Sequence, residues 1–171
     1  MKGDGEHLVD GIAASYYGVS NVGAAIHRSK YEGYGDFPDY LLKLTLKAFG
    51  KTFGRDKFDM VMFVPPTCSG DLVKNFAVKF ASVLRLPVEY SLTKKRITKE
   101  QKIFQNNYNK KDNVLNAFNV HKNIVEGKRI SLIDDIYDSG ATLKEIGNLL
   151  IDKVALQVVP ITIAKTVGGT L

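Results

Sequence analysis

Predicted strands alternate with predicted helices along most of this 171-residue chain, and that alternation limits the fold more than any other feature. Apolar runs at 58–66, 128–136 and 155–166 have the composition of buried strands. Amphipathic helical patterns at 69–86 and 141–153 lie between them. Strands that are separated by helices of this length form parallel sheets with helices packed against their faces. We therefore predict an α/β fold whose open, mainly parallel, twisted sheet carries helices on both faces.

Four further segments extend this prediction. Residues 6–18 and 87–92 have the content of short strands, and residues 21–33 and 36–54 have helical patterns. In the helix at 36–54, the predicted apolar stripe comprises Tyr40, Leu41, Leu44 and Ala48. In the helix at 69–86, it comprises Leu72, Phe76, Phe80 and Leu84.

Length and composition predict one ordinary globular domain. A chain of 171 residues with 44% hydrophobic residues fills a single core. We expect one domain over 1–171, with an N-terminal segment at 1–57 and a core at 58–166. The sequence contains no apolar run of membrane-spanning length and no signal-peptide pattern at its start. The single cysteine, Cys68, is compatible with a reducing compartment, so we expect a cytoplasmic protein.

One polar stretch, at 94–120, interrupts the alternation. It is rich in Lys and Asn and lies between two predicted strands. A connection of this length in a compact domain is typical of a functional flap or of a disordered segment. We predict a flexible hood over a binding site, and the alternative is a solvated, partly helical excursion without a role. The formal net charge of +6 favours anionic partners but does not choose among them.

Three aspartates fall within the segment SLIDDIYDSGAT, residues 131–142. Asp134 and Asp135 end the strand predicted at 128–136, and Asp138 follows in a turn. Side chains alternate along a strand, so the adjacent pair should point to opposite sides. Ligands of open α/β sheets bind in the crevice beyond the carboxyl ends of the strands. The three acids are therefore candidates for ligand binding.

Directly after these acids, residues 139–142 lead into a predicted helix. The amides at a helix N-terminus favour a bound anion, and Gly140 would let the backbone approach it. Two structural interpretations stay open: Thr142 and Glu145 fit a capping box, and Asp138 could cap a turn. Neither explains an acidic pair, which would repel a phosphate unless a cation or hydroxyl groups satisfy it. One ligand with a phosphate, a ribose diol and a metal would explain both features.

The same segment resembles the phosphoribosyl-pyrophosphate (PRPP) signature of type I phosphoribosyltransferases. That signature has four mostly apolar residues, two acids and a small loop that ends in Gly-x-Thr, which here are ISLI, DD and IYDSGAT. A P-loop is a poorer match because no Lys follows Gly140. The resemblance covers about residues 58–166 and implies the type I phosphoribosyltransferase fold.

The resemblance also implies a role for each part of the motif. The acidic pair, Asp134 and Asp135, would hold the ribose hydroxyls and the metal-bound substrate, with Mg²⁺ as the cofactor. Asp138 would contact the incoming base and act as a proton donor or acceptor. The 5′-phosphate would bind to Asp138, Ser139, Gly140, Ala141 and Thr142. The loop after the first core strand would hold pyrophosphate through Thr67, Cys68, Ser69 and Gly70, although it contains no Arg or Lys. Hood contacts would come from Arg96, Gln101 and Lys102.

Parts of the hood resemble a narrower branch of the family. Lys95-Arg96, Thr98, Gln101-Lys102 and the run DNVLNAF look like the competence-protein ComF branch. The RGFNQ type of segment that is common in ComF proteins is absent, and SGDLVKNFA stands in its place. The N-terminal run NVGAAIHRSKYEGYGDFP is similar to ComF-like domains attached to RecQ-type DNA helicases.

The resulting functional prediction is an enzyme that transfers the phosphoribosyl group of PRPP to a nitrogenous base, for example a purine, or to an amine. The alternative is a catalytically silent PRPP- or nucleotide-binding module linked to DNA uptake or helicase function. The expected partners are PRPP and a small-molecule acceptor, and a homodimer is compatible with the fold. Direct nucleic-acid binding is a third hypothesis. It would use Lys94, Lys95, Arg96, Lys99, Lys102, Lys110 and Lys111.

Overall fold

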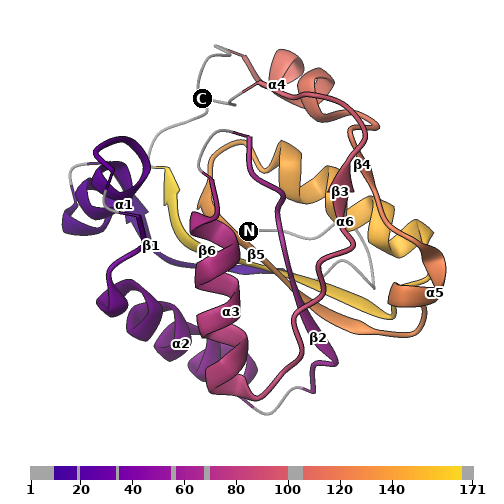
Figure 1. The fold of residues 1–171 in the computed structure, drawn as a ribbon, viewed down its shortest axis with the longest axis horizontal. Helices are drawn as coiled ribbons and strands as arrows, with labels where there is room; N and C mark the ends of the chain where they lie inside the picture. The colour runs from indigo at the N-terminus through magenta and orange to yellow at the C-terminus, as the bar shows by residue number, and fades with distance from the viewer. Residues whose placement is uncertain are drawn as a thin grey trace.

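A parallel sheet forms the centre of the molecule. The computed structural model describes residues 10–18, 20–33, 35–54, 57–67, 70–99 and 106–166. The sheet has four strands in the order β1-β6-β5-β2, and every neighbouring pair is parallel (Figure 1). These strands are β1 (Ile12–Tyr17), β2 (Met60–Phe63), β5 (Arg129–Tyr137) and β6 (Gln157–Thr166). The carboxyl ends of parallel strands meet at one edge, where ligands of such sheets bind.

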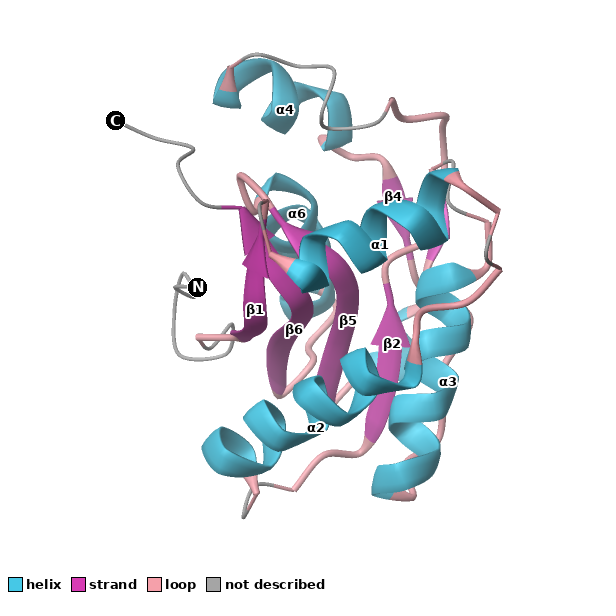
Figure 2. Ribbon diagram, turned by 90° about the vertical axis from the view of Figure 1, so that its left-hand side faces the viewer, coloured by secondary structure: helices cyan, strands magenta, loops and turns pink. Residues whose placement is uncertain are grey.

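Helices cover both faces of this sheet, as Figure 2 shows. One face carries α1 (Asn21–Tyr31), α2 (Asp39–Phe53) and α3 (Leu72–Leu84), and the other carries α6 (Ala141–Asp152) and the short α5 (Lys122–Val125). Side chains alternate along the strands, so each face has its own core: Ile133 and Val61 pack toward α1–α3, and Leu132 and Met62 pack toward α6. The predicted α/β fold class is confirmed.

The hood is built partly from regular structure. It contains β3 (Thr93–Lys94), α4 (Asn107–Val114) and β4 (Phe118–Asn119), and β3 pairs with β4 in the antiparallel direction. In Figure 1, α4 lies above α6 at the upper end of the molecule. Val114, Ala117 and Phe118 are buried in the same core as α6. The described part of the hood is therefore anchored by apolar packing, and its flexibility stays a prediction.

Two local predictions were wrong in part. In α2, Leu41 is buried as predicted and Leu44 packs against the core, but Tyr40 is 46% exposed. Thr45 and Phe49 are buried instead, because the buried stripe follows four-residue steps from Leu41. Residues 87–92 do not form a strand. They make one parallel bridge, from Val88 to Val61, after which the chain turns toward the hood. None of the helices in the described ranges is long and apolar enough to cross a membrane.

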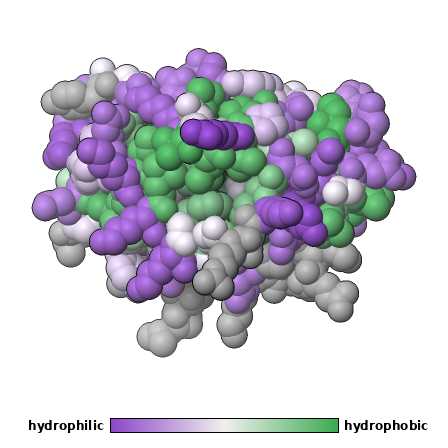
Figure 3. Space-filling view, turned by 90° about the horizontal axis from the view of Figure 1, so that it is seen from below, coloured by the Kyte–Doolittle hydropathy of each residue, from purple (hydrophilic) through white to green (hydrophobic). Residues whose placement is uncertain are grey.

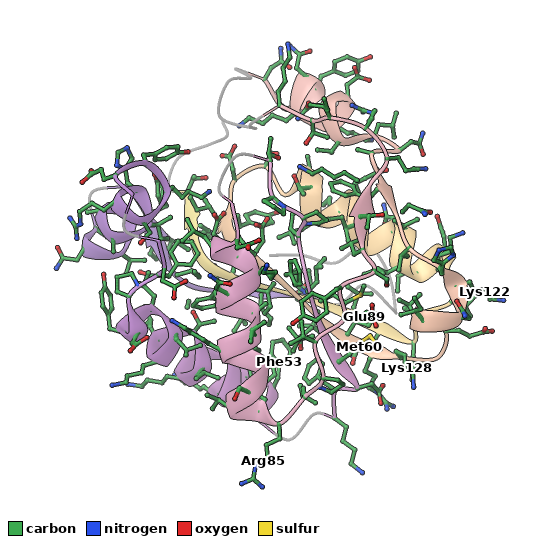
Figure 4. All side chains as sticks on the ribbon, in the orientation of Figure 1. Phe53, Met60, Arg85, Glu89, Lys122 and Lys128 are labelled. Atoms are coloured by element: carbon green, nitrogen blue, oxygen red, sulfur yellow. The ribbon has the colours of Figure 1, made fainter. Side chains whose placement is uncertain are left out.

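The end of the molecule opposite the hood exposes hydrophobic side chains in a central area bordered by hydrophilic ones, as the view from below in Figure 3 shows. Helix α3 ends here at Arg85, which points away from the protein in Figure 4. Arg85 has the left-handed conformation, with φ 56°, and its N–H bonds to the last turn of α3. This is the helix-ending geometry that glycine adopts without strain.

Arg85→Gly is therefore expected to raise the free energy of unfolding by about 1 kcal/mol, because a left-handed backbone is strained for residues other than glycine. Arg85→Ala is the matched control, since it also removes the exposed side chain but keeps the strain. Urea denaturation of both variants tests this expectation. Equal stabilities of the two variants would contradict it.

Candidate functional site

A cleft of about 540 Å³ lies at the carboxyl ends of β2 and β5. Its walls come from the loops after these two strands, the hood, the first turn of α6 and the end of α1. Most of the site residues predicted from the sequence line this one cleft. They are Thr67, Asp134, Asp135, Asp138, Ser139, Gly140, Ala141 and Thr142.

The other predicted site residues either lie outside the described residues or do not line the cleft. Cys68, Ser69, Gln101 and Lys102 lie outside the described residues. Gly70 is described but does not line the cleft. Arg96 does not line it either: its guanidinium donates to the carbonyl oxygens of Asp112 (3.2 Å) and Leu115 (2.9 Å) at the end of α4. In this structure, Arg96 therefore stabilises the hood, since cations near a helix C-terminus satisfy its free carbonyls.

The acidic pair ends in two different environments. The Asp135 side chain is 8% exposed, and its Oδ2 lies 2.5 Å from Nζ of Lys30 on α1. The Oδ1 of Asp134 accepts a hydrogen bond from the N–H of Asp135 (2.9 Å). Residues far apart in the sequence thus meet at this point, because α1 packs over the sheet edge where β5 ends.

These surroundings shift two pKa values. Burial raises the pKa of Asp134 to about 7, and the neighbouring charge of Asp135 adds to that rise, while the charges of Lys30 and Lys94 oppose it. Burial lowers the pKa of Lys30, but the hydrogen bond to Asp135 and the charges of Asp135 and Asp134 together raise it, so the net shift is upward. Near neutral pH, Asp134 is therefore close to its own titration point, while the carboxylate of Asp135 is paired with Lys30.

The loop between β5 and α6 depends on one glycine. Gly140 is the N-cap of α6 and has φ 75°, and a Cβ atom there would lie 2.6 Å from Oη of Tyr137. The Ser139 hydroxyl accepts a hydrogen bond from the N–H of Ala141 (3.3 Å). The alternative capping box at Thr142 is wrong, because the N-cap of α6 is Gly140 and Glu145 accepts instead from the N–H of Asn116 (2.6 Å). The first-turn amides of α6 thus border the cleft.

Asp138 does not cap its own turn. One carboxylate oxygen pairs with Nζ of Lys110, which comes from α4 in the hood, and the other accepts from Oγ1 of Thr166 at the end of β6 (3.1 Å). The side chain of Lys110 is 14% exposed and that of Asp138 is 30% exposed. This contact joins the hood to the loop that begins α6.

A lysine from the hood also supplies charge to the loop after β2. Nζ of Lys94 donates to the carbonyl oxygen of Pro66 (3.0 Å) and to Oγ1 of Thr67 (2.6 Å). The hydroxyl of Thr67 is also 3.3 Å from that of Thr98. The described part of this loop has no cation of its own, so the charge that its sequence lacks comes from β3.

Four lysines that line the cleft were not among the site residues predicted from the sequence: Lys30, Lys94, Lys99 and Lys110. The last three were predicted only as nucleic-acid contacts, together with Lys95 and Lys111, which do not line the cleft. The position of Lys94 at the start of the hood could have marked it as a site residue. Nothing in the sequence marked Lys30 in this way, because a lysine near the end of an amphipathic helix is ordinarily solvated.

The arrangement of Asp134 and Asp135 bears on whether they can bind a metal ion directly. Among the described residues, no group of three or more His, Cys, Asp or Glu side chains could hold a metal ion. Mg²⁺ is bound by oxygen ligands in octahedral geometry, often by one or two carboxylates and substrate phosphates. Here an ammonium group is already bound to Asp135. As arranged, the pair does not fit a metal that both carboxylates hold directly.

Comparisons with known proteins agree with the fold. No protein-family model and no curated protein sequence matches the chain. Among solved structures, it is similar to the allosteric regulatory enzyme of purine biosynthesis, with 23% identity and a TM-score of 0.50. That match covers 72% of this chain and 25% of the other.

Two further solved structures are similar at lower scores. A glutamine PRPP amidotransferase from B. subtilis is 24% identical over 70% of this chain and 26% of its own, with a TM-score of 0.46. An adenine phosphoribosyltransferase from Thermoanaerobacter pseudethanolicus is 16% identical over 74% of this chain and 79% of its own, with a TM-score of 0.48. The chain thus spans about a quarter of the length of the first two proteins. At these identities the likeness concerns the fold alone.

Proposed function

We propose that this protein is a phosphoribosyltransferase that binds PRPP and transfers its phosphoribosyl group to a nitrogen acceptor. The observation that carries the proposal is convergence on one cleft. The acidic pair after β5, the glycine turn that begins α6 and the loop after β2 all border it, and each resembles a different part of a PRPP site. A structural role for each feature alone would not require them to share a cavity.

Each part of the cleft suits one part of PRPP. Carboxylate oxygens of Asp134 and Asp135 accept hydrogen bonds from the ribose hydroxyls. The amides of the first turn of α6 and the hydroxyls of Ser139 and Thr142 bind the 5′-phosphate, as helix N-termini bind anions. The pyrophosphate lies near Thr67, where Lys94 provides a positive charge.

The proposed reaction is a substitution at the anomeric carbon of the ribose. The bond between this carbon and the pyrophosphate oxygen breaks, and the pyrophosphate leaves with the electron pair. The lone pair of the acceptor nitrogen forms the new bond to carbon, and the proton of that nitrogen passes to a base. Lys94 stabilises the charge that develops on the leaving group. A closed hood excludes water from the reacting carbon.

Asp138 is the proposed base because it lies on the loop that would face the acceptor. Both of its oxygens are engaged in the ligand-free protein, by Lys110 and Thr166. We propose that the acceptor displaces Lys110, which remains beside it as a hydrogen-bond donor. A purine fits this arrangement, because it offers both an N–H group to the carboxylate and ring acceptors to the ammonium.

The engaged state of Asp138 also favours a second candidate. A PRPP- or nucleotide-binding module without turnover would need no residue free to accept a proton. In such a module, the Lys110–Asp138 ion pair would remain intact and line the cleft. The resemblance to ComF-like domains and helicase-attached relatives supports this candidate, in which the module serves DNA uptake or unwinding. It predicts PRPP binding without release of pyrophosphate for any acceptor.

Asp134→Asn/Asp135→Asn is expected to weaken PRPP binding tenfold or more, which corresponds to about 1.4 kcal/mol, because the ribose hydroxyls lose charged acceptors. Calorimetric titration of PRPP into the wild type and this variant measures the change. Asp152→Asn is the matched control, since Asp152 is exposed at the end of α6 and does not line the cleft. Equal affinities of the double variant and the wild type would contradict the assigned site.

Turnover then separates the two candidates. Pyrophosphate release is measured with PRPP and a panel of purines, pyrimidines and amines. Release with one acceptor class, abolished in the double variant, supports the enzyme. Tight PRPP binding without release from any acceptor supports the silent module.

A further inference from the structure

The ion pair between Lys30 and Asp135 is not explained by the needs of the fold. Its side chains are 16% and 8% exposed, and their charged atoms are 2.5 Å apart. Burying two charges costs free energy that their attraction only partly returns, so such pairs are weak evidence of a stabilising role. Both residues also line the cleft. A lysine is thus held at the centre of the proposed ribose site.

Helix α1 fixes this lysine rigidly. Val22, Ala25 and Ile26 on its inner side are buried in the core between the sheet and helices α1–α3. At the start of the helix, a Cβ atom at Gly23 would lie 2.7 Å from the carbonyl oxygen of Gly18, so the helix and the preceding turn are in close contact. A helix packed in this way holds the backbone of Lys30 in place. The ammonium reaches Asp135 from a fixed direction.

The position of Lys30 has a consequence for metal binding. A carboxylate oxygen in contact with an ammonium group is not available to a divalent cation without displacing it, and the two cations repel each other. A Mg²⁺ ion demands near-ideal octahedral geometry and gives up its water ligands reluctantly. The charge of Asp135 is already matched before any ligand arrives.

We infer that Lys30 is a built-in counter-ion that takes the place of a protein-held divalent metal at Asp135, so that the cleft binds its sugar-phosphate ligand without one. The identity of that ligand rests on the proposed function, whereas the replacement of the metal by Lys30 does not. Lys30 is therefore a positioning residue: it holds the Asp135 carboxylate in place while adding a positive charge to the cleft.

Metal alone provides the first test, with no PRPP present. Mn²⁺, which prefers the same oxygen ligands as Mg²⁺, is titrated into each protein and followed by electron paramagnetic resonance. Wild type and Asp135→Asn are expected to bind Mn²⁺ within threefold of each other. Lys30→Met is expected to bind it at least tenfold more tightly, because Asp135 becomes free. Lys47→Met, on the exposed side of α2, is the matched control and should behave as wild type.

Two results would overturn the inference. One is Mn²⁺ binding by the wild type that is lost in Asp135→Asn, since the metal would then be held there despite Lys30. The other is a folded Lys30→Met protein with no gain in Mn²⁺ affinity. Lys30→Met leaves a buried carboxylate unpaired, so its melting curve is recorded first. If Lys30→Met does not fold, the comparison of wild type with Asp135→Asn still tests whether Asp135 holds a metal ion in the wild type.

PRPP provides the second test. In EDTA, the wild type is expected to retain its PRPP affinity within fivefold of the value in Mg²⁺. Lys30→Met should lose at least tenfold in EDTA and regain affinity when Mg²⁺ is added. A wild type that binds PRPP only with Mg²⁺ contradicts the inference. A wild type that binds no PRPP in either buffer contradicts the proposed function instead, and the Mn²⁺ comparison still stands.

Discussion

Asp134→Asn is expected to stabilise the ligand-free protein above pH 7 and to have little effect below pH 4. In the wild type, burial and the charge of Asp135 raise the pKa of Asp134 from 3.8 to about 7. Between these values the folded protein binds a proton that the unfolded chain does not, so stability falls as pH rises. Above pH 7, the folded protein holds an ionised Asp134 at a cost of up to about 4 kcal/mol. Asparagine avoids that cost because it has no proton to lose.

The measurement is the free energy of unfolding of both proteins at pH 4, 5.5, 7 and 8. The difference between variant and wild type should grow with pH and level off above pH 7. Asparagine keeps an oxygen that can accept from the N–H of Asp135, so loss of the 2.9 Å hydrogen bond does not confuse the result. A difference that is constant across this range would show that Asp134 has an ordinary pKa in the folded protein.

The raised pKa of Asp134 also bears on function. An ionised side chain that lowers the stability of the folded protein and lies in a cleft is typical of a binding site, where stability is lost in exchange for ligand recognition. Ribose hydroxyls would donate to the ionised form and so lower the pKa of Asp134 on binding. PRPP binding should then release protons near pH 7, which calorimetry in buffers of different ionisation enthalpy detects.

Gly140→Ala is expected to lower the free energy of unfolding by about 3 kcal/mol. About 1 kcal/mol of this follows from the left-handed backbone at φ 75°. The remainder follows from overlap, because the new Cβ atom would lie 2.6–2.8 Å from Oη and the ring carbons of Tyr137. Either the ring or the loop must move, and the loop carries the proposed phosphate site. We therefore expect PRPP binding to weaken as well.

Gly127→Ala is the matched control. Gly127 also has a positive φ, of 69°, but nothing lies within 4 Å of the Cβ position. Its replacement should cost only the backbone strain of about 1 kcal/mol. In a Tyr137→Ala background, Gly140→Ala should fall to the same cost, and a double-mutant cycle measures this coupling. Equal costs at Gly140 and Gly127 in the wild-type background would show that the tyrosine ring does not constrain the loop.

The strands and helices of the sheet could be predicted because their signals are local. The apolar runs at β2, β5 and β6 have the composition of buried strands, and the apolar stripe of α3 follows the helical period. The position of Asp134 and Asp135 at a carboxyl edge followed from the same pattern. Gly140 was also singled out from its local setting, because glycine lets the backbone of a turn adopt conformations that are strained for other residues.

Other local signals were ambiguous, and contacts elsewhere in the fold decided them. Thr142 and Glu145 have the spacing of a capping box, but α6 begins earlier and Glu145 bonds to the hood at Asn116. Residues 87–92 have strand composition, yet only Val88 pairs, because the chain must leave the sheet there to form the hood. Arg96 has the charge for a phosphate contact but satisfies carbonyls at the end of α4.

The sequence by itself determined the layers of the fold and the acids and turn of the candidate site, because these depend on residues that are neighbours in the chain. Only the tertiary structure decided which lysines bring positive charge to the acids and to the loop after β2. Lys30 reaches Asp135 from α1, Lys94 reaches the loop after β2 from β3, and Lys110 reaches Asp138 from α4. No periodicity encodes such meetings, since a charged side chain on a helix or hood is ordinarily solvated. Packing places these three lysines in the cleft, where burial strengthens their electrostatic interactions.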